Sequence, residues 1–247
     1  MAAMMTAAAA AITTAKKISK IICSAAALFG AAVYFLRYCM KKRLMVSACL
    51  LAVFAVCAYF AVSGRIERIE LQFAHFLNPN GAKSPIIRYF TDIGEFSGVF
   101  SAIVLLLLLP VTRKNIGLPV GFTVFAGWIV QVAAKIIFHR ARPEELLIQV
   151  SGYSFPSGHA LNSTTLYISV MLFSWQFCKN TAQRIALAAG CVVIPFMIGI
   201  SRIYFNVHFL TDVCGGWCLG TVFAIFGNSM YNLFVSGKSN GRIENKN

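Results

Sequence analysis

The chain has 247 residues, of which 58% are hydrophobic and 12% are charged, and its mean hydropathy is +0.72. Soluble domains are nearer half apolar and a quarter charged, so the composition excludes an ordinary soluble domain and indicates an integral membrane protein. The formal net charge of +14 would also suit nucleic-acid binding, but the positions of the charges, given below, argue against a nucleic-acid partner.

Residues 1–43 form a basic N-terminal extension, and its apolar stretch at 21–36 is shorter than the roughly 20 residues that a span needs. Positive charge flanks this stretch, so we expect a surface-lying helix, a re-entrant helix or a dispensable extension, cytoplasmic or interfacial. Met40 starts a second basic cluster, so residues 1–39 could instead come from an upstream start site. A cleaved signal peptide at 40–63 is also compatible, although its apolar run is longer than usual.

Six apolar runs follow, each near the length of a membrane-crossing helix, the second of them short. Backbone groups in lipid must be hydrogen-bonded internally, and no ten-residue alternation suggests a barrel, so these runs predict helices. We therefore expect an all-α fold, a polytopic membrane helix bundle over 44–235 with six transmembrane helices, followed by a cytoplasmic tail at 236–247. The predicted spans are 44–63, 97–112, 117–138, 159–178, 184–204 and 212–235.

Residues 64–96 form the longest outer loop. Apolar residues recur in it at helical spacing with charged residues elsewhere on the turn, which predicts an amphipathic helix at the membrane interface. This helix is either a connector that shields the bundle or part of a lipid entrance. The apolar positions are Ile66, Ile69, Phe73, Phe76 and Leu77, and the charged ones are Arg65, Arg68 and Glu70.

The charges divide unevenly between the two sides that these spans define. Residues 1–43, 113–116, 179–184 and 236–247 share one side and carry fourteen cations and one acid, a net charge of +13. The opposite side carries eight cations and seven acids, a net charge of +1. Because cytoplasmic loops are enriched in Lys and Arg, the first side is predicted to be cytoplasmic and the second to face out.

The eight cysteines lie in or beside apolar runs and form no CxxC pair. Cys214 and Cys218 are four residues apart on the last span and could be half of a metal site. We favour a packing role, because cysteine often serves as a small apolar residue. Gly216 and Gly220 on the same span predict the close approach of another helix.

Three outward-facing segments carry ionisable residues at the ends of apolar runs, where such groups are costly and usually functional. The first has Lys135 at a helix end and Arg142 before Pro143, which disfavours helical geometry and presents the arginine from an extended segment. Alone, these cations could be interfacial anchors. His139 and Arg140 lie between them, and we expect a loop or headgroup role for both rather than catalysis.

The second segment is 154–159, at the start of the fourth span. Pro156 suits a first helical turn and Gly158 leaves the neighbouring amides uncovered, so free N–H groups and the positive end of the helix dipole are predicted to point outward. This predicts an anion site that includes Ser157, with His159 beside it.

The third segment, 201–212, places Arg202, His208 and Asp212 between two apolar runs. If it is helical from His208 onward, Asp212 lies one turn away on the same face and can hold one imidazole nitrogen. The other nitrogen is then free to attack or to take a proton, and Arg202 supplies a planar cation for an anionic substrate.

Together the segments predict a phosphate-ester site at the outer ends of helices three to six. Two histidines would divide the chemistry, because His208, oriented by Asp212, can attack phosphorus while His159 protonates the leaving oxygen. The cations would neutralise the phosphate oxygens and helix amides would complete the cradle. The predicted phosphate ligands are Lys135, Arg142, Arg202 and the amides of Ser157 and Gly158.

The three motifs resemble the signature of the type 2 phosphatidic acid phosphatase family, which is related to the vanadium haloperoxidases. They are Lys-x6-Arg-Pro at 135–143, Pro-Ser-Gly-His at 156–159 and Ser-Arg-x5-His-x3-Asp at 201–212, and every signature position is filled in order. The six-span layout extends the likeness over 44–235. The segment before Met40 departs from the bacterial six-span members.

This resemblance implies a metal-free phosphatase that proceeds through a phosphohistidine. It also implies a bacterial inner membrane location with the active site facing the periplasm or the outside. The implied residues are the nucleophile His208, its partner Asp212, the general acid His159 and the phosphate ligands Lys135, Arg142, Ser157, Gly158 and Arg202.

Several alternatives stay open at this point. Undecaprenyl diphosphate, phosphatidylglycerophosphate, phosphatidate and lipid A phosphates are all compatible substrates, and the oligomeric state is open. A non-catalytic transporter or lipid-binding protein would use the same cations but leaves the pairing of His208 with Asp212 unexplained. A vanadium-dependent haloperoxidase would keep the pocket, but those relatives are soluble. Since Glu144 and Glu145 are the only further carboxylates nearby, a two-metal mechanism is disfavoured and no metal or cofactor is expected.

Overall fold

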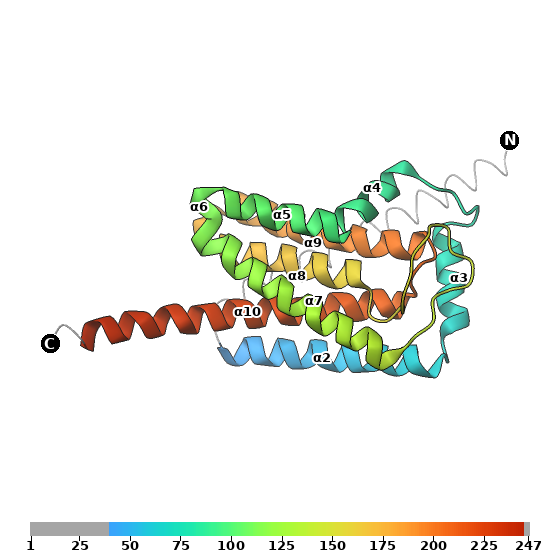
Figure 1. Cartoon of the computed structure of the whole chain (residues 1–247), viewed down its shortest axis with the longest axis horizontal. Helices are drawn as coiled ribbons and strands as arrows, with labels where there is room; N and C mark the ends of the chain where they lie inside the picture. Colours follow the sequence, from blue (N-terminus) through green and yellow to red (C-terminus); the bar gives the residue numbers. More distant parts are fainter. Residues whose placement is uncertain (1–39, 245–247) are drawn as a thin grey trace.

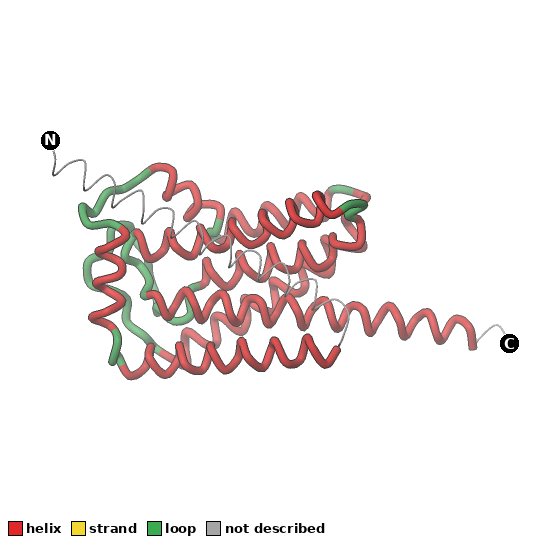
Figure 2. The backbone as a smooth tube through the Cα atoms, turned by 180° about the vertical axis from the view of Figure 1, so that it is seen from behind, coloured by secondary structure: helices red, strands yellow, loops and turns green. Residues whose placement is uncertain are grey.

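The computed structural model describes residues 40–244, and this part of the chain consists of helices joined by loops and turns, without a strand (Figure 2). The predicted all-α class is confirmed. The expectations for residues 1–39, and for the last three residues of the tail, 245–247, lie outside the described residues.

The longer helices run side by side along the long axis of the molecule, and α3 (Glu67–Leu77) lies across one end of them (Figure 1). The bundle helices are α2 (Met40–Ser63), α5 (Phe96–Leu108), α7 (Leu118–Phe138), α8 (Gly158–Ser174), α9 (Thr181–Tyr204) and α10 (Leu210–Glu244). The shorter elements are α4 (Pro85–Ile93), α6 (Pro110–Thr112), a π-helical turn at Arg113–Gly117 and a 3-10 turn at Trp175–Phe177.

Local sequence signals set where several of these helices begin. The Asn180 side chain accepts a hydrogen bond from the Gln183 amide at 2.9 Å and so caps α9. Pro119 and Pro85 lie in the first turns of α7 and α4, where a missing amide hydrogen removes no hydrogen bond. The predicted spans match helices to within about four residues at each end, with two exceptions. The second, 97–112, is divided between α5 and α6, and the last, 212–235, lies in α10, which continues to Glu244.

Four helical segments of the described chain are long and apolar enough to cross a membrane. The pair α4 and α5, bent by 57°, would be a fifth if it is one broken span. Helix α8 has 17 residues and is therefore about 25 Å long, shorter than a typical ~30 Å hydrocarbon core. The protein is thus an integral membrane protein by its helices, while the count of six spans stays a prediction. The four segments are Lys41–Ser63, Pro110–Phe138, Thr181–Tyr204 and Leu210–Val235.

Helix α8 is enclosed by its neighbours α7, α9 and α10. Its residues Ala160, Leu161, Thr165 and Met171 have no exposed surface. The Thr165 hydroxyl donates to the Leu161 carbonyl oxygen at 2.8 Å, so this buried polar group is satisfied within its own helix. The short helix can therefore be surrounded by protein, and its first turn lies at the end of the bundle that α3 covers (Figure 1).

Glycines on α10 let it approach α8 closely, as the sequence predicts. A Cβ at Gly216 would lie 2.8 Å from the Ser157 carbonyl oxygen, and one at Gly220 would lie 2.6 Å from the Leu161 carbonyl oxygen. Real Cβ atoms do not come this near to backbone oxygen, so a side chain at either position would push the helices apart.

Helix α3 confirms the helix that was predicted within the loop 64–96, but one of its charged residues is turned inward. Its exposed positions include Ile69 and Phe76, at 63% and 70%, while Glu70 is only 2% exposed. The amphipathic pattern placed Glu70 with the other charged residues, away from the apolar positions. Its burial has a specific cause, described below, because it binds groups from two other parts of the chain.

We predict that Gly220→Ala lowers the stability of the detergent-solubilised protein. The added methyl group overpacks the α8 contact, which costs about 1–3 kcal/mol. The measurement is the thermal unfolding midpoint. Gly190→Ala is the matched control, because a Cβ there meets nothing within 4 Å and alanine favours the helix. A Gly220→Ala midpoint equal to that of Gly190→Ala would contradict the close contact.

Candidate active site

The three predicted segments meet at the end of the bundle that α3 covers (Figure 1). They are the end of α7 with the loop 139–157, the first turn of α8, and the junction between α9 and α10. Sheltered ends of apolar helices are where ionisable groups can be kept from lipid and from bulk water at once. The structure thus brings together residues more than 70 positions apart in the sequence.

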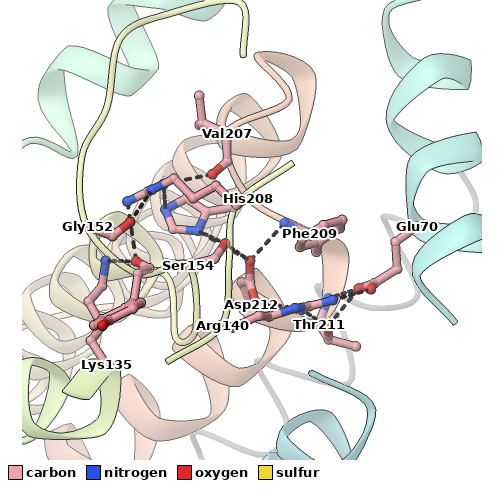
Figure 3. A network of polar contacts seen from close by, with 12 residues as sticks. Glu70, Lys135, Arg140, Gly152, Ser154, Val207, His208, Phe209, Thr211 and Asp212 are labelled. Carbon is pink, nitrogen blue, oxygen red and sulfur yellow. Dashed lines mark hydrogen bonds and ion pairs between the residues drawn. The ribbon is translucent and has the colours of Figure 1, made fainter. Parts of the chain in front are cut away.

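His208 and Asp212 are paired as the spacing predicts. The His208 Nδ1 atom lies 3.4 Å from Asp212 Oδ2 and 3.2 Å from the Ser154 hydroxyl oxygen. Ser154 also donates to Asp212 Oδ2, and the Phe209 amide donates to the same oxygen at 2.9 Å (Figure 3). The carboxylate is therefore fixed from several directions.

The opposite ring nitrogen of His208 faces a cation. Its Nε2 atom lies 3.2 Å from Arg142 Nη1, and a guanidinium can only donate, so Nε2 is the acceptor. The hydrogen of the neutral ring then lies on Nδ1, toward Ser154 and Asp212. This tautomer leaves the lone pair on Nε2, at the side where a nucleophile needs it.

Arg142 is held by backbone oxygens around its whole guanidinium group, with bonds from Nη1 to Val207 at 2.7 Å and from Nε to Gly152 at 2.9 Å. Lys135 Nζ donates to the Tyr153 carbonyl oxygen at 2.7 Å, and Arg142 Nη2 reaches the same oxygen at 3.4 Å. The two predicted phosphate cations therefore lie side by side, directed by one loop.

Arg202 and His159 complete the set from α9 and α8. Arg202 is 2% exposed, and its Nε atom has no hydrogen-bond partner among the described residues. The charges of Arg202, Lys135 and Arg142 all act on the ring of His159, as does His208. Two histidines and three cations thus share one site.

The structure differs from the predicted anion site at the start of α8 in the backbone amide of Ser157. The Ser157 amide is not free, because it donates to the Asp212 carbonyl oxygen at 3.0 Å. The Ser157 hydroxyl is buried without a partner within the described chain. The close packing of α10 at Gly216 explains the difference, since it brings the Asp212 backbone against Ser157. Gly158 follows as the first residue of α8, beside the Gln131 side chain.

Arg140 corrects the sequence-based expectation, because it is buried rather than placed near a headgroup. It is 7% exposed and lies between Asp212 and Glu70, bonded to each at 2.7 Å (Figure 3). His139 behaves as expected of a loop residue, exposed and with its ring against Tyr153. The position of Arg140 inside the first motif was a usable signal, but no local pattern marked Glu70.

Comparison with known proteins shows the family of the chain. The family model described as PAP2 superfamily matches residues 116–235. The bacitracin transport permease protein BcrC of Bacillus licheniformis is 30% identical over 175 residues, which are 65% of this chain and 79% of that protein. The chain belongs to the PAP2 superfamily.

Two further matches, a sequence and a crystal structure, come from Bacillus subtilis. Phosphatidylglycerophosphatase B of strain 168 is 40% identical over 85 residues, 33% of this chain and 41% of that protein, so the match spans less than half of its length. The crystal structure of the first transmembrane PAP2 type phosphatidylglycerolphosphate phosphatase superposes with a TM-score of 0.67 at 22% identity. It covers 75% of this chain and 96% of that one, and shows that the fold is shared.

Burial lowers the pKa of His208 to about 3, and the hydrogen bond that the ring donates to Asp212 opposes this shift without cancelling it. The folded value lies below the ordinary value of about 6.5, so the unfolded chain takes up more protons as the pH falls. The stability that neutral His208 contributes is therefore present above about pH 6.5 and is lost toward lower pH.

We predict that His208 stays neutral when the pH of the solubilised protein is lowered from about 8 to about 5. The measurement is NMR of protein labelled with ¹⁵N at histidine, with the His208 signals assigned by their absence in His208→Asn. Free histidine in the same buffer is the control and protonates near pH 6.5. Protonation of His208 near pH 6.5 would contradict the buried, neutral ring.

Proposed function

We propose that the chain is an integral membrane lipid phosphate phosphatase, which hydrolyses a phosphomonoester or a diphosphate of a membrane lipid. The observation that carries this proposal is the arrangement of His208, whose Nε2 lone pair faces Arg142 while Nδ1 is held by Ser154 and Asp212. An imidazole fixed in this tautomer beside a cation is suited to attack a phosphate group.

In the proposed reaction, His208 Nε2 attacks phosphorus and the bond to the leaving oxygen breaks. His159, protonated when the anionic phosphate is bound beside it, donates its proton to that oxygen, and the phosphoryl group remains on His208 as a phosphohistidine. A water molecule, deprotonated by His159, then attacks phosphorus, releases inorganic phosphate and restores both histidines. Asp212 stabilises the positive charge that develops on the His208 ring.

The phosphate ligands would be the three cations and the start of α8. Lys135 and Arg142 approach from one loop and Arg202 from α9, so charge developing on the phosphate oxygens meets cations from different sides. Arg202 Nε and the Ser157 hydroxyl, which have no hydrogen-bond partner in the described part of the chain, are groups that a bound phosphate could satisfy. In this proposal Gly158 contributes its amide at the helix start.

For the membrane arrangement we propose six crossings, by α2, α5, α7, α8, α9 and α10, over the domain 44–235. Residues 1–43 and 236–247 then lie on the cytoplasmic side or at its interface, and the site faces the periplasm or the outside of a bacterial inner membrane. The charge asymmetry of the loops supports this orientation.

The phosphatase relatives support a lipid phosphate as the substrate, and the choice among lipid phosphates stays open. The relative with 40% identity is named a phosphatidylglycerophosphatase, although the match covers 41% of it. Assays of phosphate release from phosphatidylglycerophosphate, phosphatidate, undecaprenyl diphosphate and lipid A, made side by side on the solubilised protein, would identify the preferred headgroup.

We predict that His208→Ala and His159→Ala each reduce phosphate release from the preferred lipid by at least about 1,000-fold, because each removes a group that acts on the reacting bond. Activity should persist in excess chelator, and vanadate should inhibit as a phosphate mimic. His139→Ala is the matched control, since this exposed histidine belongs to the loop and not to the chemistry. A His208→Ala variant as active as the parent would refute the mechanism.

A transporter or lipid-binding protein is the second candidate, favoured by the relative that is named a transport permease. A binder would use the three cations equally well but has no need for an oriented, neutral His208.

We predict that brief reaction with a ³²P-labelled lipid phosphate, followed by denaturation, leaves acid-labile and base-stable label on the parent protein. This stability is that of a phosphohistidine. The His208→Ala variant should carry no label. An unlabelled parent that nevertheless binds the lipid would favour the transporter.

A further inference from the structure

A buried ion network holds the side of Asp212 that faces away from His208. Arg140 Nη1 donates to Asp212 Oδ1 at 2.7 Å, and Arg140 Nη2 donates to Glu70 Oε2 at 2.7 Å (Figure 3). The exposed fractions of these side chains are 0% for Asp212, 1% for Glu70 and 6% for Arg140. Because water and salt do not reach them, these charges interact far more strongly than a surface pair does.

Thr211 closes the network into a ring. Its amide and its hydroxyl both donate to Glu70 Oε1 at 2.7 Å, and the hydroxyl also accepts from Arg140 Nη1 at 2.7 Å. The Arg140 guanidinium lies 4.0 Å from the centre of the Phe209 ring, which supports it from another direction. Glu70 therefore fixes both the arginine and the first turn of α10.

The two oxygens of Asp212 have separate partners. Oδ1 is bound by Arg140, whereas Oδ2 is bound by Ser154, the Phe209 amide and His208. A buried ion network is costly to desolvate and is weak grounds for stability alone. Because the network binds only Oδ1 of Asp212, it instead controls how the Asp212 carboxylate is turned toward the imidazole of His208.

We propose that Arg140 is a positioning residue for the phosphatase reaction and that Glu70 anchors it from α3. Arg140 binds Oδ1 of Asp212, so that Oδ2 is presented to His208, and Glu70 acts through Arg140. This inference rests on the proposed function. Neither residue touches the substrate, so their loss should slow the chemical steps and leave binding of the lipid phosphate nearly unchanged.

The test measures kcat and KM for phosphate release by the solubilised full chain with the lipid found best in the panel. Arg140→Gln should lower kcat by about 100-fold with KM within twofold, because a small misplacement of the catalytic groups has that effect. Arg140→Lys keeps the positive charge but lacks the two guanidinium nitrogens that bind Asp212 and Glu70 together, so it should recover part of the lost kcat. Glu70→Gln should lower kcat by about tenfold, since its shape and its bonds to Thr211 remain.

The double variant Glu70→Gln/Arg140→Gln separates an effect through Arg140 from two independent effects. If Glu70 acts through Arg140, the double variant should have the kcat of Arg140→Gln alone, whereas independent effects would multiply. The matched control is Arg88→Gln, which breaks an exposed arginine to aspartate bridge of 2.8 Å and should keep the parent values.

The outcomes distinguish this inference from the proposed function. An inactive parent, on every lipid of the panel, overturns the proposed function. An active parent with unchanged kcat in Glu70→Gln and Arg140→Gln overturns the positioning role, as does a rise in KM at constant kcat. If Arg140→Gln does not fold, the near-isosteric Glu70→Gln decides alone, and a kcat equal to that of the parent overturns the proposal.

Discussion

The pairing of Asp212 with Arg140 is the interaction on which the site depends. Asp212 has no exposed surface, and a buried carboxylate without partners would be strongly destabilising. Arg140 neutralises it, but one arginine between Asp212 and Glu70 leaves the three charges at −1 overall. Arg142, on the other side of His208, brings this sum to zero, so the charges on the two sides of the imidazole depend on each other electrostatically.

The charges in this sum come from segments far apart in the sequence, which meet at one end of the bundle. Arg140 and Arg142 leave α7 two residues apart, yet the first points to Asp212 and the second to His208 Nε2. Both arginines lie in the irregular loop that follows α7, and His139 before them has a left-handed φ of 45°, so no regular helical or strand spacing sets the relative directions of their side chains. The amide of Ser154 donates to the Arg140 carbonyl oxygen at 2.8 Å and draws the loop back onto the site.

The helices and the motif residues could be predicted from the sequence because they depend on local patterns. Apolar length indicated each long helix, and the four-residue spacing placed Asp212 against His208. The bent pair α4 and α5, and the use of the Ser157 amide by Asp212, depend on packing between helices and left no local signal. Glu70 is paired with Arg140 across 70 residues, so a single sequence shows it only as one charge on an amphipathic turn.

The sequence of helix α3 left two roles open, a connector that shields the bundle and a part of a lipid entrance. Its inner face is a connector, because Glu70 ties it to Arg140 and to the start of α10. Its outer face keeps Ile69 and Phe76 exposed, as a helix in contact with lipid requires. Because Glu70 is bound to Arg140 and Thr211, a shift of α3 would move Glu70 and, in the proposed mechanism, would turn the Asp212 carboxylate relative to His208. The ion network therefore joins the helix with this exposed apolar face to Asp212, the carboxylate that is bound to His208.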